Sequence, residues 1–418
     1  MGQIANVQFI VNAISRKWGD RTVAPVPGTE LQTANTEYLL RMIDRANDGR
    51  TDYGSSSFAT QQIVDDIAVL DAVDRFWTSG TIWRAVSSGR LAASTDGINW
   101  THTAFTGGWQ HIAFADGKWV AVGTGGIIAT STDGINWTET SFGLGSGTLS
   151  YVAFANGRWV AVGGGSVFQA PANAFIATSI NGTDWTLASF TGTGQLQHVA
   201  FGSGRWIAVG GDGGGTGGSG NSGFIATSID GINWTRITAV SGNIGWNNVA
   251  FANGRWMIVG GGVGAVSHIN IITSTDGINW IYVTLGGNYR SVVFANGRWV
   301  AVGSGSGAAV GSNGNVVTST DGINWTEIQV GPATSVLLHV VFADSRWVAI
   351  GNNIMVTSTD GINWTHTAFT GTWNNIVFGN GRWVAVGNNG NIATSTDGVN
   401  WTQITVGNNH WQSVAFGE

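Results

Sequence analysis

Short apolar runs separated by turn signals recur along most of the chain. Between residues 109 and 141, apolar runs at 112–114, 119–122 and 127–130 alternate with Asp116-Gly117 and Asp133-Gly134. Asn-Gly and Asp-Gly supply the positive-φ residues that a two-residue hairpin needs. With a further strand at 137–140, the pattern predicts four antiparallel strands in about 40 residues, as in a propeller blade.

Two motifs repeat from about residue 80 to the carboxyl end. The heptapeptide Ser-Thr-Asp-Gly-Ile-Asn-Trp, or a close variant, ends at eight tryptophans: Trp100, Trp137, Trp185, Trp234, Trp280, Trp325, Trp364 and Trp401. The second motif resembles Val-Ala-Phe-Ala-Asn-Gly-Arg-Trp-Val-Ala-Val-Gly, and Trp83 marks a degenerate copy of it. A lone four-stranded sheet cannot cover both of its faces, so neighbouring units must pack and the ring must close.

These repeats predict an all-β fold, an eight-bladed β-propeller of four-stranded antiparallel blades. The first unit begins at Trp83 without a clear inner strand, whereas residues 411–418 form an inner strand with no blade after it. Pairing the two closes the ring with the C-terminal strand. The alternative is that Phe76 and Trp77 supply the first strand, and seven blades is the second choice.

Charge divides the chain near Thr78. Residues 1–78 carry ten acidic and seven basic residues with five Gly, whereas residues 79–418 carry fourteen and eleven with 60 Gly. We therefore expect two domains, 1–78 and 79–418. Helical spacing at 36–43 and 57–76 predicts a small, mainly helical N-terminal domain. It would be a cap or linker, or an attachment or oligomerisation segment, because two short helices bury little alone.

Composition excludes several classes of protein. The chain has no Cys, which removes disulfide scaffolds, thiolate metal sites and thiol catalysis. It has a net charge of −6 and only two lysines, so a nucleic-acid-binding surface is not expected. No apolar run approaches the ~20 residues of a membrane span, and residues 1–20 lack the features of a signal peptide. We expect no cofactor, no metal and no membrane insertion, and synthesis in a host cytoplasm.

The heptapeptide resembles the Asp-box of sialidases and of photosystem II stability-factor-like and sortilin-like propellers, although it is one residue shorter. The resemblance implies a structural turn between the outer two strands, in which Asp accepts backbone amides, Gly takes positive φ and Trp packs between blades. The aspartates of this turn are Asp96, Asp133, Asp230, Asp276, Asp321, Asp360 and Asp397. The third copy has Asn181 instead.

Sialidase chemistry would require an arginine cluster, a Tyr-Glu pair and an acidic Asp. The arginines of the second motif occupy one equivalent position in each repeat, so they cannot converge on one ligand group. Non-repeated acids are too few for a two-carboxylate glycosidase site. We therefore expect no enzyme and no catalytic residues, with a sialidase-type activity as the minor alternative.

Comparison of the copies predicts one uniform and one variable face. The turns after the first and third strands are nearly uniform, whereas those after the second and fourth vary in length, with long loops at 163–173, 210–223, 260–268 and 303–313. Variable loops on a rigid scaffold commonly carry specificity.

Two positions near the variable face are candidate ligand-binding positions. The first holds Trp109, Trp246, Tyr289, Trp373 and Trp411, with Leu149, Leu196 and Leu337 in the other copies. It forms either core packing or a rim of aromatic platforms for sugar rings. The second holds His111, Tyr151, His198, His339, Asn248, Ser291, Asn375 and Ser413. It forms either a solvated channel wall or a ring of hydrogen-bonding groups for a ligand.

These features favour a binding module displayed by an N-terminal anchor. Such arrays behind a short attachment domain resemble bacteriophage tail-fibre and other virion appendage proteins. The resemblance implies a virion protein whose residues 1–78 contact virion or tail proteins and whose propeller loops bind a host-surface glycan or receptor; the stripe of Ile63, Ile67, Leu70 and Trp77 permits a homo-oligomer. The alternatives are a structural virion decoration protein without a receptor, or a protein-binding assembly scaffold.

Overall fold

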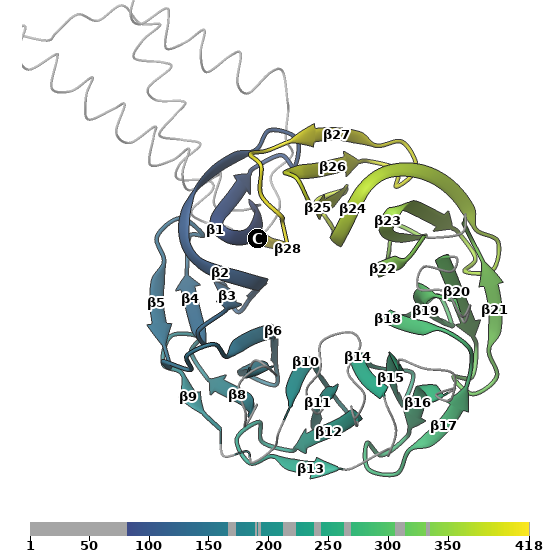
Figure 1. Cartoon of the computed structure of the whole chain (residues 1–418), viewed down its shortest axis with the longest axis horizontal. Coiled ribbons are helices and arrows are strands. Elements are labelled where there is room, and N and C mark those ends of the chain that lie inside the picture. The colour runs from purple at the N-terminus through teal and green to yellow at the C-terminus, as the bar shows by residue number, and fades with distance from the viewer. Residues whose placement is uncertain are drawn as a thin grey trace, which may run out of the picture. The chain divides into compact units, whose positions relative to one another are not determined.

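The computed structural model describes residues 82–417, apart from 166–172, 189, 191–193, 212–222, 238–243, 263–268, 306–313 and 332–334. All of them belong to the second of the chain's two units, Phe76–Glu418. The predicted helices and apolar stripe of residues 1–78 lie outside the described residues, as do most residues of the long loops. The regular structure of the described part is entirely strand, arranged as a ring of blades (Figure 1).

In chain order from the closing strand, the blades follow one another counter-clockwise in Figure 1, and each of the first four contributes four antiparallel strands. Their strands are β28 (Ser413–Gly417), β1 (Ile82–Ser94) and the start of β2 (Thr101–Ala115); the end of β2, β3 (Lys118–Gly123), β4 (Ile127–Ser131) and β5 (Thr138–Ser141); β6 (Thr148–Ala155), β7 (Arg158–Gly164), β8 (Ala174–Ser179) and β9 (Thr186–Leu187); and β10 (Gln195–Gly202), β11 (Arg205–Gly211), β12 (Gly223–Ser228) and β13 (Thr235–Ile237).

The last four blades repeat the arrangement. Their strands are β14 (Ile244–Ala252), β15 (Arg255–Gly262), β16 (Ile269–Ser274) and β17 (Ile281–Thr284); β18 (Asn288–Ala295), β19 (Arg298–Ser304), β20 (Gly314–Ser319) and β21 (Thr326–Gln329); β22 (Leu337–Ala343), β23 (Arg346–Ser358) and the start of β24 (Thr365–Gly379); and the end of β24, β25 (Arg382–Gly387), β26 (Asn391–Ser395) and β27 (Thr402–Thr405). β1 and β23 each supply both middle strands of their blade. The first half of each pairs with the inner strand, β28 or β22, and the second half pairs with the outer strand, β2 or β24.

The carboxyl-terminal strand closes the ring. β28 pairs antiparallel with the first half of β1, in a register that places Ile82 opposite Gly417 and Val86 opposite Ser413. The fold is therefore the predicted eight-bladed propeller closed by its C-terminal strand. The seven-blade alternative is wrong, and β28, not Phe76 and Trp77, supplies the inner strand of the first blade.

The core lies between the blades. One hydrophobic cluster, for example, joins Trp83 and Ala85 of the first blade to Val384 and Val386 of the eighth. In every blade the inner-strand Phe packs on the Trp of the second strand at 4.7–5.1 Å between ring centroids. Most of the chain's 22 tryptophans are thus architectural. Among the described residues, no helix has the length and apolar character needed to cross a bilayer.

Each inner strand from β2 to β24 contains a β-bulge at the same place. The pairing register shifts between the two candidate ligand-binding positions, for example between Trp109 and His111 and between Tyr289 and Ser291. The bulged residues are Gln110, Ser150, Gln197, Asn247, Arg290, Leu338 and Asn374. A bulge leaves one residue outside the ladder and re-aims nearby side chains, so each blade can reach its neighbour at this level.

Candidate functional site

The strand order separates two faces of the ring, as the sequence predicts. We call "turn face" the side with the hairpins after the first strands and the heptapeptide turns after the third strands. We call "loop face" the side with the connections after the second and fourth strands. Because neighbouring strands are antiparallel throughout each blade, these two sets of connections lie at opposite strand ends.

The heptapeptide turn uses its aspartate internally. Asp230 Oδ1 accepts hydrogen bonds from the amides of Ile232 and Asn233, both at 2.8 Å, and Oδ2 accepts from Asn233 Nδ2 at 2.7 Å. The hydroxyl of Ser228 donates to the same carboxylate. These amide hydrogen bonds lower the pKa of Asp230 below its ordinary value. The six equivalent aspartates make the same contacts to their own turns.

The third copy preserves this arrangement by exchanging two residues. Asn181 replaces the aspartate, Asp184 replaces the asparagine three residues later, and Asn181 Nδ2 donates to Asp184 Oδ2 at 2.7 Å. The amide-to-carboxylate bond is therefore kept with its direction reversed. Within the described residues no group of three or more His, Asp or Glu side chains could hold a metal ion, and the turn chemistry is that of a structural element.

The repeated arginines act as spacers between blades. Arg158 NH1 donates to Thr178 of its own blade at 3.1 Å, and the equivalent pairs recur at 3.0–3.3 Å for Arg205, Arg255, Arg298 and Arg382. The stem of Arg158 lies against the next blade's heptapeptide glycine so closely that a Cβ on Gly231 would be 2.6 Å from Arg158 Cδ. These arginines are distributed around the ring and share no common ligand group.

Of the two interpretations of the aromatic position, core packing is confirmed and a rim of exposed platforms is wrong. Trp109, Trp246, Tyr289, Trp373 and Trp411 are each 0% exposed, as are Leu149, Leu196 and Leu337 at the same position. Each is packed in a hydrophobic cluster between blades, where Trp, Tyr and Leu all bury a large apolar area. Their ring faces are covered by protein and cannot stack on a sugar.

The second predicted set does form a ring, and its members link neighbouring blades. Five of the eight side chains accept a hydrogen bond from the next blade. The donor is the backbone amide of the residue that follows the equivalent position in that blade. The bonds are Ile112 N to Ser413 Oγ, Val152 N to His111 Nδ1, Val292 N to Asn248 Oδ1, Val340 N to Ser291 Oγ and Val414 N to Asn375 Oδ1, at 3.1–3.4 Å. We call the eight residues of this second set the polar ring: His111, Tyr151, His198, Asn248, Ser291, His339, Asn375 and Ser413.

On one side of the polar ring three aromatic side chains lie in contact, with their planes tilted by 32° and 37°. The ring centroids of His111 and Tyr151 are 4.0 Å apart, and those of Tyr151 and His198 are 3.9 Å apart. Burial lowers the pKa of His111 and His198 to about 3, with repulsion among the histidines adding to it, and burial lowers that of His339 to about 4. At neutral pH these histidines are uncharged, so the ring offers neutral donors and acceptors.

Two ring atoms have no partner. Nδ1 of His198 and Nδ1 of His339 are buried without a hydrogen bond. Buried polar atoms in native proteins are rarely left unpaired. The ring therefore combines structural bonds between blades with unused hydrogen-bonding capacity on two of its histidines.

The interface between the first and second blades departs from the repeat. Ile82 takes the position of the motif arginine, and Arg84 lies two residues later, 3% exposed. Arg84 Nε donates to the carbonyl of Gly134 at 2.7 Å, and the guanidinium lies 5.8 Å from the Trp119 ring centroid. Burial lowers the pKa of Arg84 to about 10, although Asp133 opposes this shift. The sequence signal was available, because the first copy has Ile-Trp-Arg where the others have Arg-Trp-Val or a close variant.

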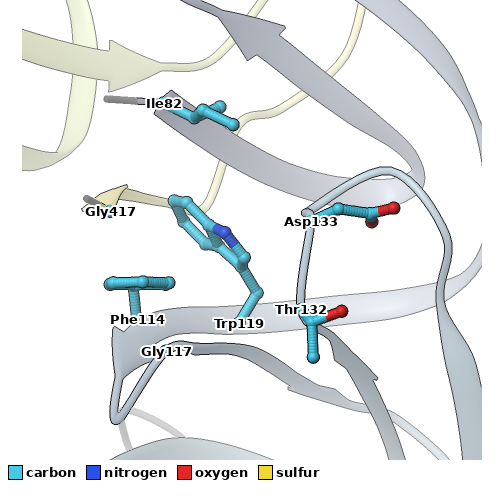
Figure 2. A pocket seen from close by; sticks show the side chains of 7 residues that line it. All are labelled: Ile82, Phe114, Gly117, Trp119, Thr132, Asp133 and Gly417. Carbon is cyan, nitrogen blue, oxygen red and sulfur yellow. The ribbon is translucent and has the colours of Figure 1, made fainter. Parts of the chain in front are cut away.

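A small cavity of about 110 Å³ opens at this interface. Figure 2 shows Trp119 between Ile82, Phe114 and Gly417, with Asp133 on the adjacent turn and its carboxylate directed away from the indole. The Asp133 carboxylate already accepts the amides of Ile135 and Asn136. At other blade interfaces the stem of the motif arginine packs in this place. The cavity lacks the converging polar groups of a ligand site.

Comparison with known proteins agrees with the fold. A family model described as the DUF6242 beta propeller domain matches residues 286–410, which is less than half of the chain. No curated protein matches the sequence.

Three solved structures resemble the chain. The computationally designed Ika8 protein has a TM-score of 0.53 and 12% identity, covering 73% of this chain and 90% of that chain. Apo AztD from Citrobacter koseri has a TM-score of 0.52 and 9% identity, with 81% and 98% covered. Virginiamycin B lyase from Staphylococcus aureus has a TM-score of 0.50 and 8% identity, with 66% and 90% covered. At these identities the likeness shows the β-propeller fold alone. The fold by itself does not decide between an enzyme and a binding protein.

Proposed function

We propose that this chain is a non-enzymatic binding module in which the loop face of the propeller recognises its ligand. The observation that carries the proposal is the contrast between the two faces. On the turn face the side-chain oxygens of the heptapeptide aspartates are occupied by their own turns. On the loop face the connections vary in length from blade to blade, and the bulged residues beside the polar ring include neutral polar, apolar and cationic side chains.

The groups on the described residues favour binding over catalysis. The polar-ring histidines are spaced by whole blades, with no Asp or Glu of the ring beside them. General acid–base or nucleophilic chemistry needs a base within hydrogen-bond reach of its partner. A rim of neutral donors and acceptors instead suits reversible recognition of a hydroxyl-rich ligand.

As the biological setting, we propose a virion appendage protein of the tail-fibre kind. Residues 1–78 would attach to virion or tail proteins, and the loop face would bind a glycan or receptor on the host surface. This part of the proposal is supported by the resemblance of the repeat array behind a short N-terminal segment to such proteins. If no surface ligand is found, the protein is instead a structural decoration protein or an assembly scaffold.

The absence of cysteine allows a direct test of the face. Gln197→Cys places one thiol on an exposed bulge residue beside the loop face, and Ile135→Cys places one on a heptapeptide turn where the side chain is 70% exposed. The full chain, each variant carrying a bulky maleimide polymer, is tested for binding to host-type cells and to a glycan array. We expect the Gln197→Cys conjugate to lose binding and the Ile135→Cys conjugate to keep it.

Three other outcomes would contradict the proposal. Loss of binding only in the Ile135→Cys conjugate would assign the ligand to the turn face. Full binding by both conjugates would move recognition away from the loop face. Failure of the unlabelled chain to bind any cell or glycan would leave the decoration or scaffold role.

A further inference from the structure

Arg290 occupies a singular place in the ring. It is the bulged residue of β18, between the buried Tyr289 and the polar-ring residue Ser291. Since β18 runs from the loop face toward the turn face, Arg290 lies on the loop-face side of the polar ring. The bulged residues of the other inner strands are uncharged: Gln110, Ser150, Gln197, Asn247, Leu338 and Asn374.

The guanidinium of Arg290 has an unused buried donor. Its Nε is buried and has no hydrogen-bond partner. Burial lowers the pKa of Arg290 from its ordinary value, with no carboxylate among the causes. By contrast, Arg84 satisfies its Nε on the Gly134 carbonyl, and the repeated arginines donate to threonines of their own blades. A buried cationic donor without an acceptor is costly, and native proteins rarely keep one without a reason.

The loop-face connections of the blade that carries Arg290 supply no acid to pair with it. The connections of the sixth blade, 303–314 and 330–337, contain no Asp or Glu. Of the acids of this blade, Asp321 accepts the amides of its own heptapeptide turn, and Glu327 accepts a hydrogen bond from Asn315 at 2.7 Å. Most other acids of the propeller lie in the turns of the opposite face.

A second unpartnered nitrogen lies on the adjacent blade. The backbone amide of Val340 donates to Ser291 Oγ. Val340 follows His339 and Ser291 follows Arg290, so this hydrogen bond joins the two strands next to both residues. His339 Nδ1 is buried without a partner. A neutral imidazole donates from one nitrogen, so the inner strands of two adjacent blades carry a guanidinium and an imidazole, each with an unpartnered nitrogen. Guanidinium groups bind planar oxyanions with particular strength and geometry.

We propose that Arg290, with His339 beside it, binds the oxyanion of an acidic saccharide at the loop-face mouth of the polar ring. The inference rests on the proposed function, since it names the chemical class of the ligand that the loop face takes. The guanidinium supplies charge and paired donors to a carboxylate or sulfate group, and the neutral polar ring lies beside the hydroxyl-rich remainder.

The test uses the full chain and three probes: glucuronate, neutral glucose and inorganic sulfate. Binding is followed by calorimetry for the unchanged protein and for Arg290→Gln. The control is Arg90→Gln, which removes the same charge from β1 of the first blade. We expect glucuronate to bind at least tenfold more tightly than glucose. Arg290→Gln should abolish this difference, and Arg90→Gln should retain it.

Stability provides an independent readout. If Arg290 is held unpaired for a ligand, Arg290→Met should leave the thermal midpoint of the ligand-free protein unchanged or raise it. A clearly lowered midpoint would mean that Arg290 is a structural residue and would overturn the inference.

The remaining outcomes also decide the matter. Equal glucuronate binding by the unchanged protein and Arg290→Gln, or no glucuronate binding at all, overturns it. Arg290-dependent binding of sulfate without glucuronate overturns the assignment to a saccharide. If Arg290→Gln still binds cells while the Gln197→Cys conjugate does not, the proposed function stands and this inference fails.

Discussion

Trp83 packs on Phe416 across 333 positions of the sequence, with ring centroids 4.7 Å apart and an interplanar angle of 51°. In the other blades the same tilted pair forms within one hairpin, as between Phe294 and Trp299 at 5.0 Å and 56°. The closing blade is therefore packed like the rest. Ring closure depends on an inner strand that follows all the other described strands in the sequence.

Phe416→Ala should destabilise the propeller as much as Phe294→Ala does. Truncation of a large core aromatic costs about 3–5 kcal/mol when it is fully buried, and somewhat less is expected for these half-buried rings. Urea unfolding of both variants, followed by tryptophan fluorescence, gives the comparison. A loss for Phe416→Ala of under a third of that for Phe294→Ala would show that the closing strand contributes little to stability.

The exchanged pair in the third heptapeptide predicts a coupling in the fourth. Asn233→Asp alone places two carboxylates where Asn233 Nδ2 now donates to Asp230 Oδ2 at 2.7 Å. We expect it to destabilise the protein near neutral pH. Adding Asp230→Asn should restore most of the loss, because the pair then matches Asn181 and Asp184.

A double-mutant cycle on these two positions measures the effect. Directly contacting residues commonly couple by about 0.5–3 kcal/mol, and we expect a value near the middle of that range. Additive losses for the two single variants would contradict the proposed exchange.

The buried histidines of the polar ring predict acid sensitivity. The unfolded chain binds a proton on each histidine below its ordinary pKa of about 6.5, whereas His198 in the folded state resists protonation until its pKa of about 3. The unfolded state therefore binds more protons, and stability falls as the pH decreases from about 6.5 toward 3. Each such histidine can cost up to about 2 kcal/mol by pH 5.

Urea midpoints at pH 7 and pH 5 check this dependence. His198→Gln should reduce the difference between the two midpoints, and His366→Gln, at an exposed position, should leave it unchanged. An identical pH dependence in both variants would argue against proton uptake by the polar ring.

The heptapeptide aspartates act in a lower range of pH. Burial opposes ionisation of Asp96, but hydrogen bonds from Asn99, Ile98 and Ser94 outweigh it and bring its pKa to about 2. A carboxyl whose pKa is depressed stabilises the fold above its unfolded pKa near 4, and this stabilisation is lost as the pH falls toward 2. Asp96→Asn should thus lose less stability than the unchanged protein between pH 4 and pH 2 in thermal unfolding scans, with Asp116→Asn as the control. Equal losses would contradict this account.

The irregular first interface can be repaired by design. Arg84→Val removes the buried hydrogen bond to Gly134 and should cost about 2 kcal/mol, as expected for a hydrogen bond from a charged group. Combining it with Ile82→Arg and Ala93→Thr recreates the arginine–threonine pair of the other blades. We expect the triple variant to recover most of the loss in thermal unfolding. A triple variant as unstable as the single one would mean that this interface differs in more than these residues.

Prediction from the sequence was strongest for the fold and weakest for exposure. Eight heptapeptides and eight Trp motifs specify eight blades, because each unit repeats the same strand and turn signals. The unpaired strand at the carboxyl end indicated closure, and the pairing of Ile82 with Gly417 confirms it. For the aromatic position the sequence left core packing and an exposed rim open, because alternation along one strand does not tell whether a side chain meets solvent or the next blade. Trp109 is 0% exposed because a neighbouring blade covers it.

The sequence by itself determined the β-propeller, its number of blades and the identity of its two kinds of turn, because short-range hairpin chemistry is written in Asp-Gly and Asn-Gly pairs. It also marked the polar ring as a set of equivalent positions. Only the tertiary structure decided which of these groups have partners. The bulge, the links between blades and the unpaired Arg290 Nε arise from the distance between neighbouring blades at the ring. That distance depends on packing across eight interfaces and is not encoded in any single repeat.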